Sequence, residues 1–230
     1  MKLTHKLKKL ANPEAIKRAI SSLRPIPVDR FLKEIDPVEL KRIQEAYSLP
    51  GEASNWRKYT DAKVYLKMNI HRVREIGLDK MPPQHVLDIG SGAGYFLFVC
   101  RVLGHSGFGL DLEEPKLYEE MFQLFGLKRS AHRVEKFKPL PDTGAKYNLI
   151  TAFSIVFNEH WKPNPWAPAE WDYFLNDASQ HLLPGGRIYL NLNPMTPGGA
   201  YCSNEVRDFF LSKGAKADRD CNFFFPPTEK

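Results

Sequence analysis

The chain has 230 residues and a formal net charge of +6, with 43% hydrophobic and 26% charged residues. This balance is typical of a folded globular protein, and the length suits one domain with an extension rather than two full domains. No apolar run approaches the ~18 residues that a membrane-spanning helix needs. The basic start also lacks the continuous apolar stretch of a secretory signal.

Cysteine and histidine usage bears on redox compartment and metal binding. The three cysteines are odd in number and far apart, which fits neither a disulfide framework nor a thiolate metal site and favours a reducing compartment. Five histidines lack metal-ligand spacing: His71, His85, His105, His132 and His181. We therefore predict a cytoplasmic protein without a metal site.

The first fifty residues are predicted to form short helices separated by five prolines. Apolar residues recur at helical spacing over residues 3–10, 16–23 and 40–47, so each piece has one apolar side. We expect a helical N-terminal extension or cap over residues 1–58, followed by a larger domain over 59–230. Residues 1–30 hold eight Lys or Arg against two acids, which can attract anionic partners, although a solvated helix face carries the same pattern.

After a turn near Gly51, an apolar stripe over residues 66–76 predicts a further helix. From residue 84 onward, short apolar strands alternate with helices, which predicts a doubly wound, Rossmann-like α/β fold with a mostly parallel sheet. The predicted strands are residues 85–89, 107–110, 131–134, 147–152 and 187–192, with an antiparallel edge strand at 222–225. Helical stripes cover residues 95–102, 117–124 and 171–182, the last stopped by Pro184-Gly185-Gly186.

A glycine-rich loop follows the first predicted strand. Gly90, Gly92 and Gly94 alternate where the strand becomes a helix, and Asp88 stands two residues before the first of them. Only glycine lets a ligand approach such a backbone closely. Asp111, at the end of the next strand, is placed to accept hydrogen bonds from ribose hydroxyls.

The loop departs from the dinucleotide-binding fingerprint G-x-G-x-x-G, because Tyr95 stands where that pattern needs its third glycine. Asp88 would also place negative charge near a pyrophosphate, whereas a ligand that carries an ammonium and a sulfonium gains from that charge. The loop therefore favours an amino-acid nucleoside over NAD. A plain strand-to-helix turn would show the same glycines without a ligand.

These residues resemble the class I S-adenosylmethionine-dependent methyltransferases, whose first motif has the form D-x-G-x-G-x-G. Asp88, Gly90, Gly92 and Gly94 match that motif, and the resemblance covers roughly residues 60–225. It extends through the segments 107–111, 146–152 and 182–190 and leaves the basic N-terminal arm unexplained.

The resemblance implies S-adenosylmethionine as cofactor and S-adenosylhomocysteine as product. It places Gly90, Ser91 and Gly92 against the methionine part, with Asp88 orienting the ammonium. Asp111 would hold the ribose hydroxyls. The adenine base would be bordered by four residues: Leu112, Val134, Glu135 and Phe153. For Phe153, ordinary core packing is an equal alternative.

The segment after the fourth predicted strand, residues 157–161, is the candidate for the acceptor side, because ligands of open α/β sheets bind beyond the carboxyl ends of the strands. His160 titrates near neutrality and can serve as general base, with Glu159 or Asn158 orienting either it or the acceptor. A surface histidine without a catalytic role is the competing interpretation.

Three functions remain open on the sequence. The first is a methyltransferase that acts on a small molecule or glycan at oxygen or nitrogen. The second is a nucleic-acid methyltransferase that uses the basic arm, although the Asn/Asp-Pro-Pro-aromatic motif of base-amine methyltransferases is replaced by Ala152-Phe-Ser-Ile155. The third is a cofactor-binding module without activity, and a dehydrogenase is a distant fourth.

Overall fold

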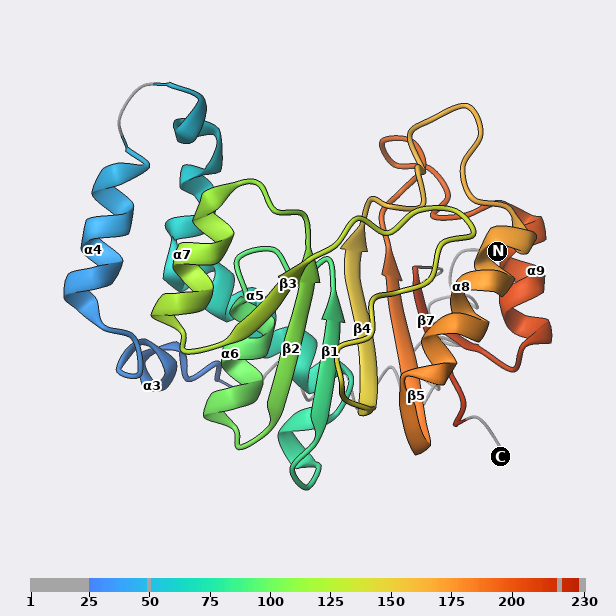
Figure 1. Ribbon diagram of the computed structural model, residues 1–230, viewed down its shortest axis with the longest axis horizontal. Helices are drawn as coiled ribbons and strands as arrows, with labels where there is room; N and C mark the ends of the chain where they lie inside the picture. The colour runs from blue at the N-terminus through green and yellow to red at the C-terminus, as the bar shows by residue number, and fades with distance from the viewer. Residues whose placement is uncertain (1–24, 49–50, 219–220, 228–230) are drawn as a thin grey trace, which may run out of the picture.

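The computed structural model describes residues 25–48, 51–218 and 221–227. Seven strands form one sheet in the order β3-β2-β1-β4-β5-β7-β6. The strands are β1 (His85–Ile89), β2 (Ser106–Asp111), β3 (Lys128–Ala131), β4 (Tyr147–Ile155), β5 (Leu182–Leu192), β6 (Lys216–Asp218) and β7 (Asn222–Phe225). The first five run parallel, and β7 pairs antiparallel with β5. This confirms the predicted doubly wound fold (Figure 1).

Helices cover both faces of the sheet. One face packs on α5 (Ala62–Glu75), α6 (Tyr95–Val102) and α7 (Lys116–Leu124), and the other on α8 (Pro168–Gln180) and α9 (Asn204–Ser212). Alternation along β1 decides which side chains face which layer: Val86 joins the first core and Leu87 the second. Asp88, two residues after Val86, therefore shares the face that carries α5 and α6.

The N-terminal helices pack on the first layer. They are α3 (Val28–Leu32), α4 (Pro37–Ala46) and the 3-10 helix η1 (Glu52–Thr60), with the short η2 (Leu78–Lys80) after α5. Phe31 and Ile43 are buried in the same core as α6. The apolar stripes predicted over residues 3–10 and 16–23 lie outside the described residues, and the division at residue 58 stays a prediction.

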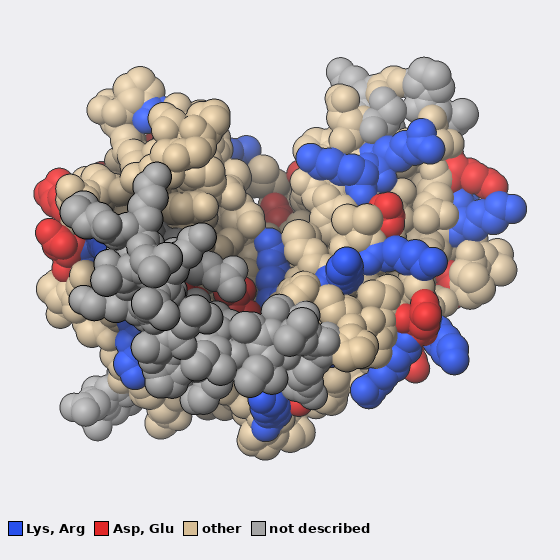
Figure 2. Space-filling view, turned by 180° about the vertical axis from the view of Figure 1, so that it is seen from behind, with Lys and Arg blue, Asp and Glu red and all other residues tan. Residues whose placement is uncertain are grey.

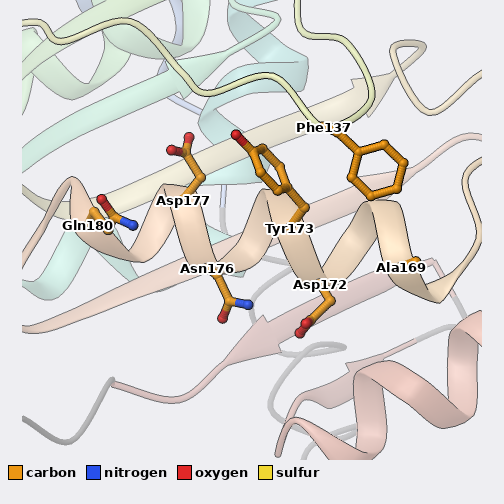
Figure 3. A pocket seen from close by; sticks show the side chains of 7 residues that line it. All are labelled: Phe137, Ala169, Asp172, Tyr173, Asn176, Asp177 and Gln180. Atoms are coloured by element: carbon orange, nitrogen blue, oxygen red, sulfur yellow. The ribbon is translucent and has the colours of Figure 1, made fainter.

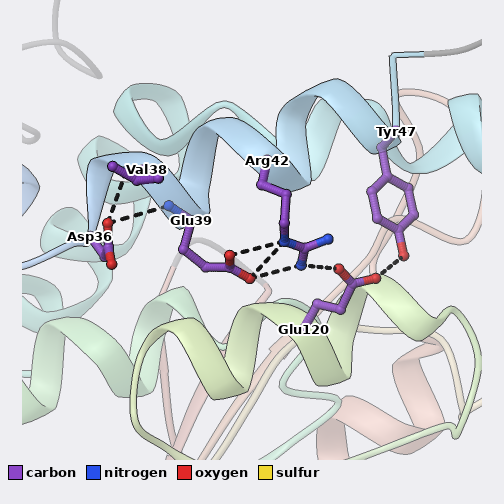
Figure 4. Close-up of polar contacts among 6 residues, drawn as sticks. All are labelled: Asp36, Val38, Glu39, Arg42, Tyr47 and Glu120. Atoms are coloured by element: carbon purple, nitrogen blue, oxygen red, sulfur yellow. Dashed lines mark hydrogen bonds and ion pairs between the residues drawn. The ribbon is translucent and has the colours of Figure 1, made fainter.

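Polar contacts fix α4 against α7 (Figure 4). The Tyr47 hydroxyl donates to Glu120 Oε1 at 2.9 Å, and Arg42 Nη2 donates to Glu120 Oε2 at 2.7 Å. Arg42 also binds Glu39 within α4. Burial and the Glu120 carboxylate together raise the pKa of Tyr47 to about 12, so its hydroxyl stays a donor at neutral pH.

Two predicted boundaries are wrong, and the predicted antiparallel strand has a further strand beside it. The third strand covers residues 128–131 rather than 131–134, because its pairing with β2 ends where Ala131 meets Asp111. The helix predicted up to residue 182 ends at Gln180, and residues 182–186 enter β5, whose register with β4 shifts there. Finally, β7 is antiparallel as predicted but lies inside the sheet, since the unpredicted β6 pairs with its outer side.

Candidate functional site

The loop between β1 and α6 is built on three glycines with left-handed backbone. Their φ angles are +74° at Gly90, +55° at Gly92 and +76° at Gly94, a region that side chains rarely adopt. A Cβ atom at Gly90 or Gly92 would meet nothing within 4 Å, whereas one at Gly94 would lie 2.7 Å from the Phe122 ring. The first two glycines therefore leave open space for a ligand, and the third is required by packing.

Asp111 holds this loop in place. Its Oδ2 accepts a hydrogen bond from the Gly92 amide at 2.6 Å, and its Oδ1 accepts one from the Leu112 amide at 2.7 Å. Burial raises the pKa of this carboxyl, and the two amide donors oppose that rise. A carboxylate oxygen has more than one acceptor direction, so Asp111 can still receive hydroxyl donors from a ligand.

Asp88 is a buried carboxyl group under the loop, with 3% of its surface exposed. The Thr151 hydroxyl on the neighbouring strand β4 donates to Asp88 Oδ1 at 2.6 Å. Burial raises the pKa of Asp88 to about 7, although the Thr151 bond and the positive charge of Arg72 act in the opposite direction. A buried carboxyl group of this kind favours a cationic partner.

Arg72 is a site residue that the sequence did not reveal. It extends from α5 toward the end of β4, where it donates to Ser154 Oγ at 2.9 Å and lies 4.6 Å above the Phe153 ring. It also donates to Asn69 Oδ1 at 3.1 Å. Both hydrogen-bond acceptors are neutral oxygens, and burial lowers the pKa of the guanidinium while Asp88 raises it. A buried acid under the glycine loop and a partly buried base at the end of β4 thus lie near enough for each charge to affect the other.

Ser91, in the glycine loop, contributes an orphan polar atom that lies near Gly109 of β2. Its hydroxyl is buried and has no hydrogen-bond partner in the structure. The open backbone at Gly90 and Gly92, the acid at Asp88 and the base at Arg72 fit a ligand that carries both an ammonium and a carboxylate. These residues therefore suit the methionine part of S-adenosylmethionine.

Comparison with known proteins identifies the fold. No protein-family model and no curated protein matches the chain. A TehB-like SAM-dependent methyltransferase from Corynebacterium glutamicum matches in structure with a TM-score of 0.53 and 17% identity, over 83% of this chain and 100% of that one. DesVI from Streptomyces venezuelae matches with a TM-score of 0.50 and 14% identity, over 71% and 92% of the two chains.

The chain has the class I methyltransferase fold. Identities this low establish the architecture alone, so ligand and reaction depend on the residues of the site. In this methyltransferase fold the glycine loop, Asp88 and Asp111 all lie at the carboxyl ends of β1 and β2. Figure 2 shows the surface hollowed between two lobes on the side toward which the parallel strands point in Figure 1.

The residues predicted around the adenine are more scattered than those at the glycine loop. Leu112 follows Asp111 and is 37% exposed, as an adenine contact requires. Val134 is partly buried against the core on the α8 side, and Glu135 is exposed and bound to Lys138 at 2.8 Å. Their roles remain predictions, and the earlier end of β3 moves both of them three residues or more past the sheet.

Phe153 is only 7% exposed. Its ring centroid lies 4.7 Å from that of Phe96 and 5.1 Å from that of Tyr189, with the Arg72 guanidinium above it. These contacts favour core packing, which is one of the two roles that the sequence allows for Phe153. The other is a contact with the adenine. The Phe153 ring also contacts the guanidinium of Arg72, the base whose charge acts on Asp88.

On the acceptor side, β4 ends in a bulge at Ser154, which has a φ of +51°. The Asn191 Oδ1 atom accepts from the Ser154 amide at 3.0 Å, and Asn193 Nδ2 donates to the carbonyls of Ser154 and Ile155 at 2.8 and 2.9 Å. Strained backbone of this kind persists only where neighbours hold it, and it is frequent at functional sites.

His160 lies in the loop that follows this bulge. Its Nδ1 is 3.3 Å from the Oδ1 atom of Asn158. Asn158 is a buried residue with 5% of its surface exposed. Burial lowers the pKa of His160, which leaves more of the neutral imidazole that a general base requires. The carboxylate of Glu159 instead binds Lys162 at 2.7 Å and Lys136 at 3.6 Å. Asn158, rather than Glu159, therefore contacts the His160 ring, and the catalytic roles of His160 and Glu159 remain predictions.

A separate hollow of about 360 Å³ lies on the outer side of α8. Figure 3 shows Phe137 approaching that helix from the preceding loop, opposite Tyr173. The hollow contains none of the predicted site residues. Among the described residues, no group of three or more His, Cys, Asp or Glu could hold a metal ion, and no described helix is long and apolar enough to cross a membrane.

Proposed function

We propose that the protein is an S-adenosylmethionine-dependent methyltransferase. The observation that carries this proposal is the pair of opposite charges at the glycine loop: Asp88 beneath it and Arg72 beside it. An amino acid group has the complementary ammonium and carboxylate. When bound, S-adenosylmethionine supplies a methyl group that its sulfonium activates for direct displacement.

The residues of the chain then have separate tasks. Asp88 binds and orients the ammonium, Arg72 faces the carboxylate, and Asp111 receives the ribose hydroxyls. The loop glycines admit the ligand to the backbone. Because the displacement needs alignment more than covalent catalysis, most of the protein's contribution is positioning.

For the acceptor, we propose a small molecule or glycan that is methylated on oxygen or nitrogen. In this proposal His160 removes a proton from a hydroxyl or ammonium acceptor, and the contact of its Nδ1 with Asn158 supports that role. Trp161 is 56% exposed beside it and offers an aromatic wall for a sugar or other apolar surface. A cytoplasmic location remains a prediction from the sequence.

Calorimetric titration tests the cofactor. We expect saturable binding of S-adenosylmethionine and S-adenosylhomocysteine and none of NAD, because Asp88 opposes a pyrophosphate. Saturable binding of NAD alone would contradict the proposal. If S-adenosylmethionine binds but no member of a broad acceptor panel yields S-adenosylhomocysteine, the protein is a binding module.

The catalytic role of His160 has its own test once the panel yields an acceptor. We expect His160→Ala to lower turnover by about 10²-fold or more, as loss of a general base does, with little change in cofactor affinity. His181→Ala, at the end of α8, is the matched control. Equal turnover in the two variants removes His160 from the mechanism.

A further inference from the structure

A row of basic side chains lies along the outer side of α5, and the last of them, Arg74, donates to the Pro25 carbonyl at 2.8 Å. Lys63, Lys67, His71 and Arg74 follow one another at intervals of four, four and three residues, which places them on one side of the helix. The first three are exposed, and Arg74 is partly buried. Arg72 lies on a different side of the helix and points to the candidate site.

Further basic residues lie in η1, just before α5, where Arg57 and Lys58 stand between two aromatic residues in Trp56-Arg57-Lys58-Tyr59. Arg57 and Lys58 are exposed, and the two rings are half-buried. The Lys58 ammonium lies 5.0 Å above the Tyr59 ring. Trp56 and Tyr59 stack on each other with ring centroids 6.0 Å apart. Cations flanked by aromatic rings suit nucleic acid, because phosphates bind the cations and bases can contact the exposed edges of the rings.

A hollow of about 570 Å³ adjoins residues 57–61. Arg57 and Lys58 line it together with Gln44, Thr60 and Asp61. The volume lies in the range of small-ligand pockets, about 300–1,000 Å³, which is sufficient for a nucleotide. Asp61 is the one acid in residues 55–74, against six Lys or Arg, and its side chain already caps α5 by accepting from the Val64 amide.

The end of the row at η1 lies beside the candidate cofactor loop. The Tyr95 hydroxyl donates to the Tyr59 carbonyl at 2.9 Å, and Tyr95 directly follows Gly94. Figure 2 shows the Lys and Arg side chains placed one above another over the half of the molecule that carries η1 and α5. A chain bound along this row would therefore end at the rim of the candidate site.

We propose that η1 and the outer side of α5 form a docking track for single-stranded RNA. Its phosphates lie along the cations of α5, and its bases reach the edges of Trp56 and Tyr59. A single row of basic side chains with two aromatic rings at one end fits one strand of phosphates better than it fits the broad plane of a lipid surface. This inference concerns docking and does not require the proposed methyl transfer.

The test is fluorescence anisotropy with the full chain and a labelled single-stranded RNA of about 12 nucleotides, within the usual site sizes. We expect K63E/K67E to weaken binding by about tenfold or more at 0.05 M salt. Each phosphate contact contributes about 0.7 to the slope of log affinity against log salt for single strands, so the slope should fall by about 1.4.

The matched control is K128E/K216E, which makes the same charge change on exposed lysines of β3 and β6. The basic N-terminal arm is present in all three proteins, so general attraction by that arm is the same in each. Thermal unfolding measures whether each variant is folded. We expect the control to bind RNA within about twofold of the wild type.

Equal loss in the two double variants would overturn the proposal, because general charge would then explain binding. So would a wild-type protein that ignores this RNA, or one that sediments with phosphatidylserine vesicles while RNA fails to compete. Titration with S-adenosylmethionine separates this result from the proposed function. RNA docking without cofactor binding would retain the track and remove the methyltransferase.

Discussion

Replacing Asp88 with asparagine should turn a pH-dependent cofactor site into a weak site that is independent of pH. The wild-type carboxyl is 3% exposed, and burial raises its pKa to about 7. Asparagine keeps the shape and can still accept the Thr151 hydroxyl, which bonds to Asp88 Oδ1 at 2.6 Å. The substitution therefore removes the charge with little change in packing.

The magnitude follows from the charge. A hydrogen bond to a charged group contributes about 1.5–3 kcal/mol, so at pH 7.5 the variant should bind S-adenosylmethionine about 10- to 150-fold more weakly. For the wild type, an ammonium binds when Asp88 is ionised, so affinity falls as the pH drops below about 7. Between pH 7.5 and 5.5 one such group lowers affinity by about 25-fold, and the variant should show no such decrease.

The assay is isothermal titration calorimetry from pH 5.5 to 7.5, which stays below the ordinary α-amino pKa of about 7.7–8.0. Other titrating groups near the site are Asp111, whose pKa burial raises, and His160, whose pKa burial lowers. Both are unchanged in the variant. An equal pH slope in wild type and variant, or an unchanged affinity at pH 7.5, would refute the role of Asp88.

The same substitution has a consequence for the protein without cofactor. Folding raises the Asp88 pKa from 3.8 to about 7, so the folded state binds a proton that the unfolded state has lost. The free energy of unfolding must therefore fall as the pH rises from about 4 to about 7. Asp88→Asn should remove this part of the decrease, which urea denaturation at several pH values measures.

Four further substitutions test the loop and the cap, one of them as a control. Asp111→Ala should weaken cofactor binding by about 1–3 kcal/mol, because it removes an acceptor and releases the Gly92 amide; unchanged affinity in calorimetry would contradict that assignment. Gly92 and Gly126 have φ angles of +55° and +60° and open space where a Cβ atom would lie. Gly92→Ala and its control Gly126→Ala should each lower the free energy of unfolding by about 1 kcal/mol. Only Gly92→Ala should impair cofactor binding. Tyr47→Phe deletes the bond to Glu120 and should lower the free energy of unfolding by about 1 kcal/mol, and an unchanged urea midpoint would show that this contact contributes nothing.

The amino-acid pattern alone was sufficient for the architecture. Apolar strands that alternate with helices bury a parallel sheet on both faces, and this pattern located the central strands and the loop after β1. The third strand was misplaced because β3 lies on an edge and begins with Lys128 and Arg129, which give no apolar signal. Proline and glycine at 184–186 predicted a helix end, whereas the structure accommodates them in a register shift of β5.

For the candidate site, local motifs indicated Asp88, Asp111 and the glycines because these residues are close in the sequence or follow adjacent strands. Arg72 could not be found in this way, since its approach to Ser154 joins residues 82 positions apart. The orientation of Phe153 toward the core and the pairing of Glu159 with lysines also depend on neighbours that other elements supply. Backbone pattern is a local property of the chain, whereas opposing charges around a ligand are brought together only when helices pack on the sheet.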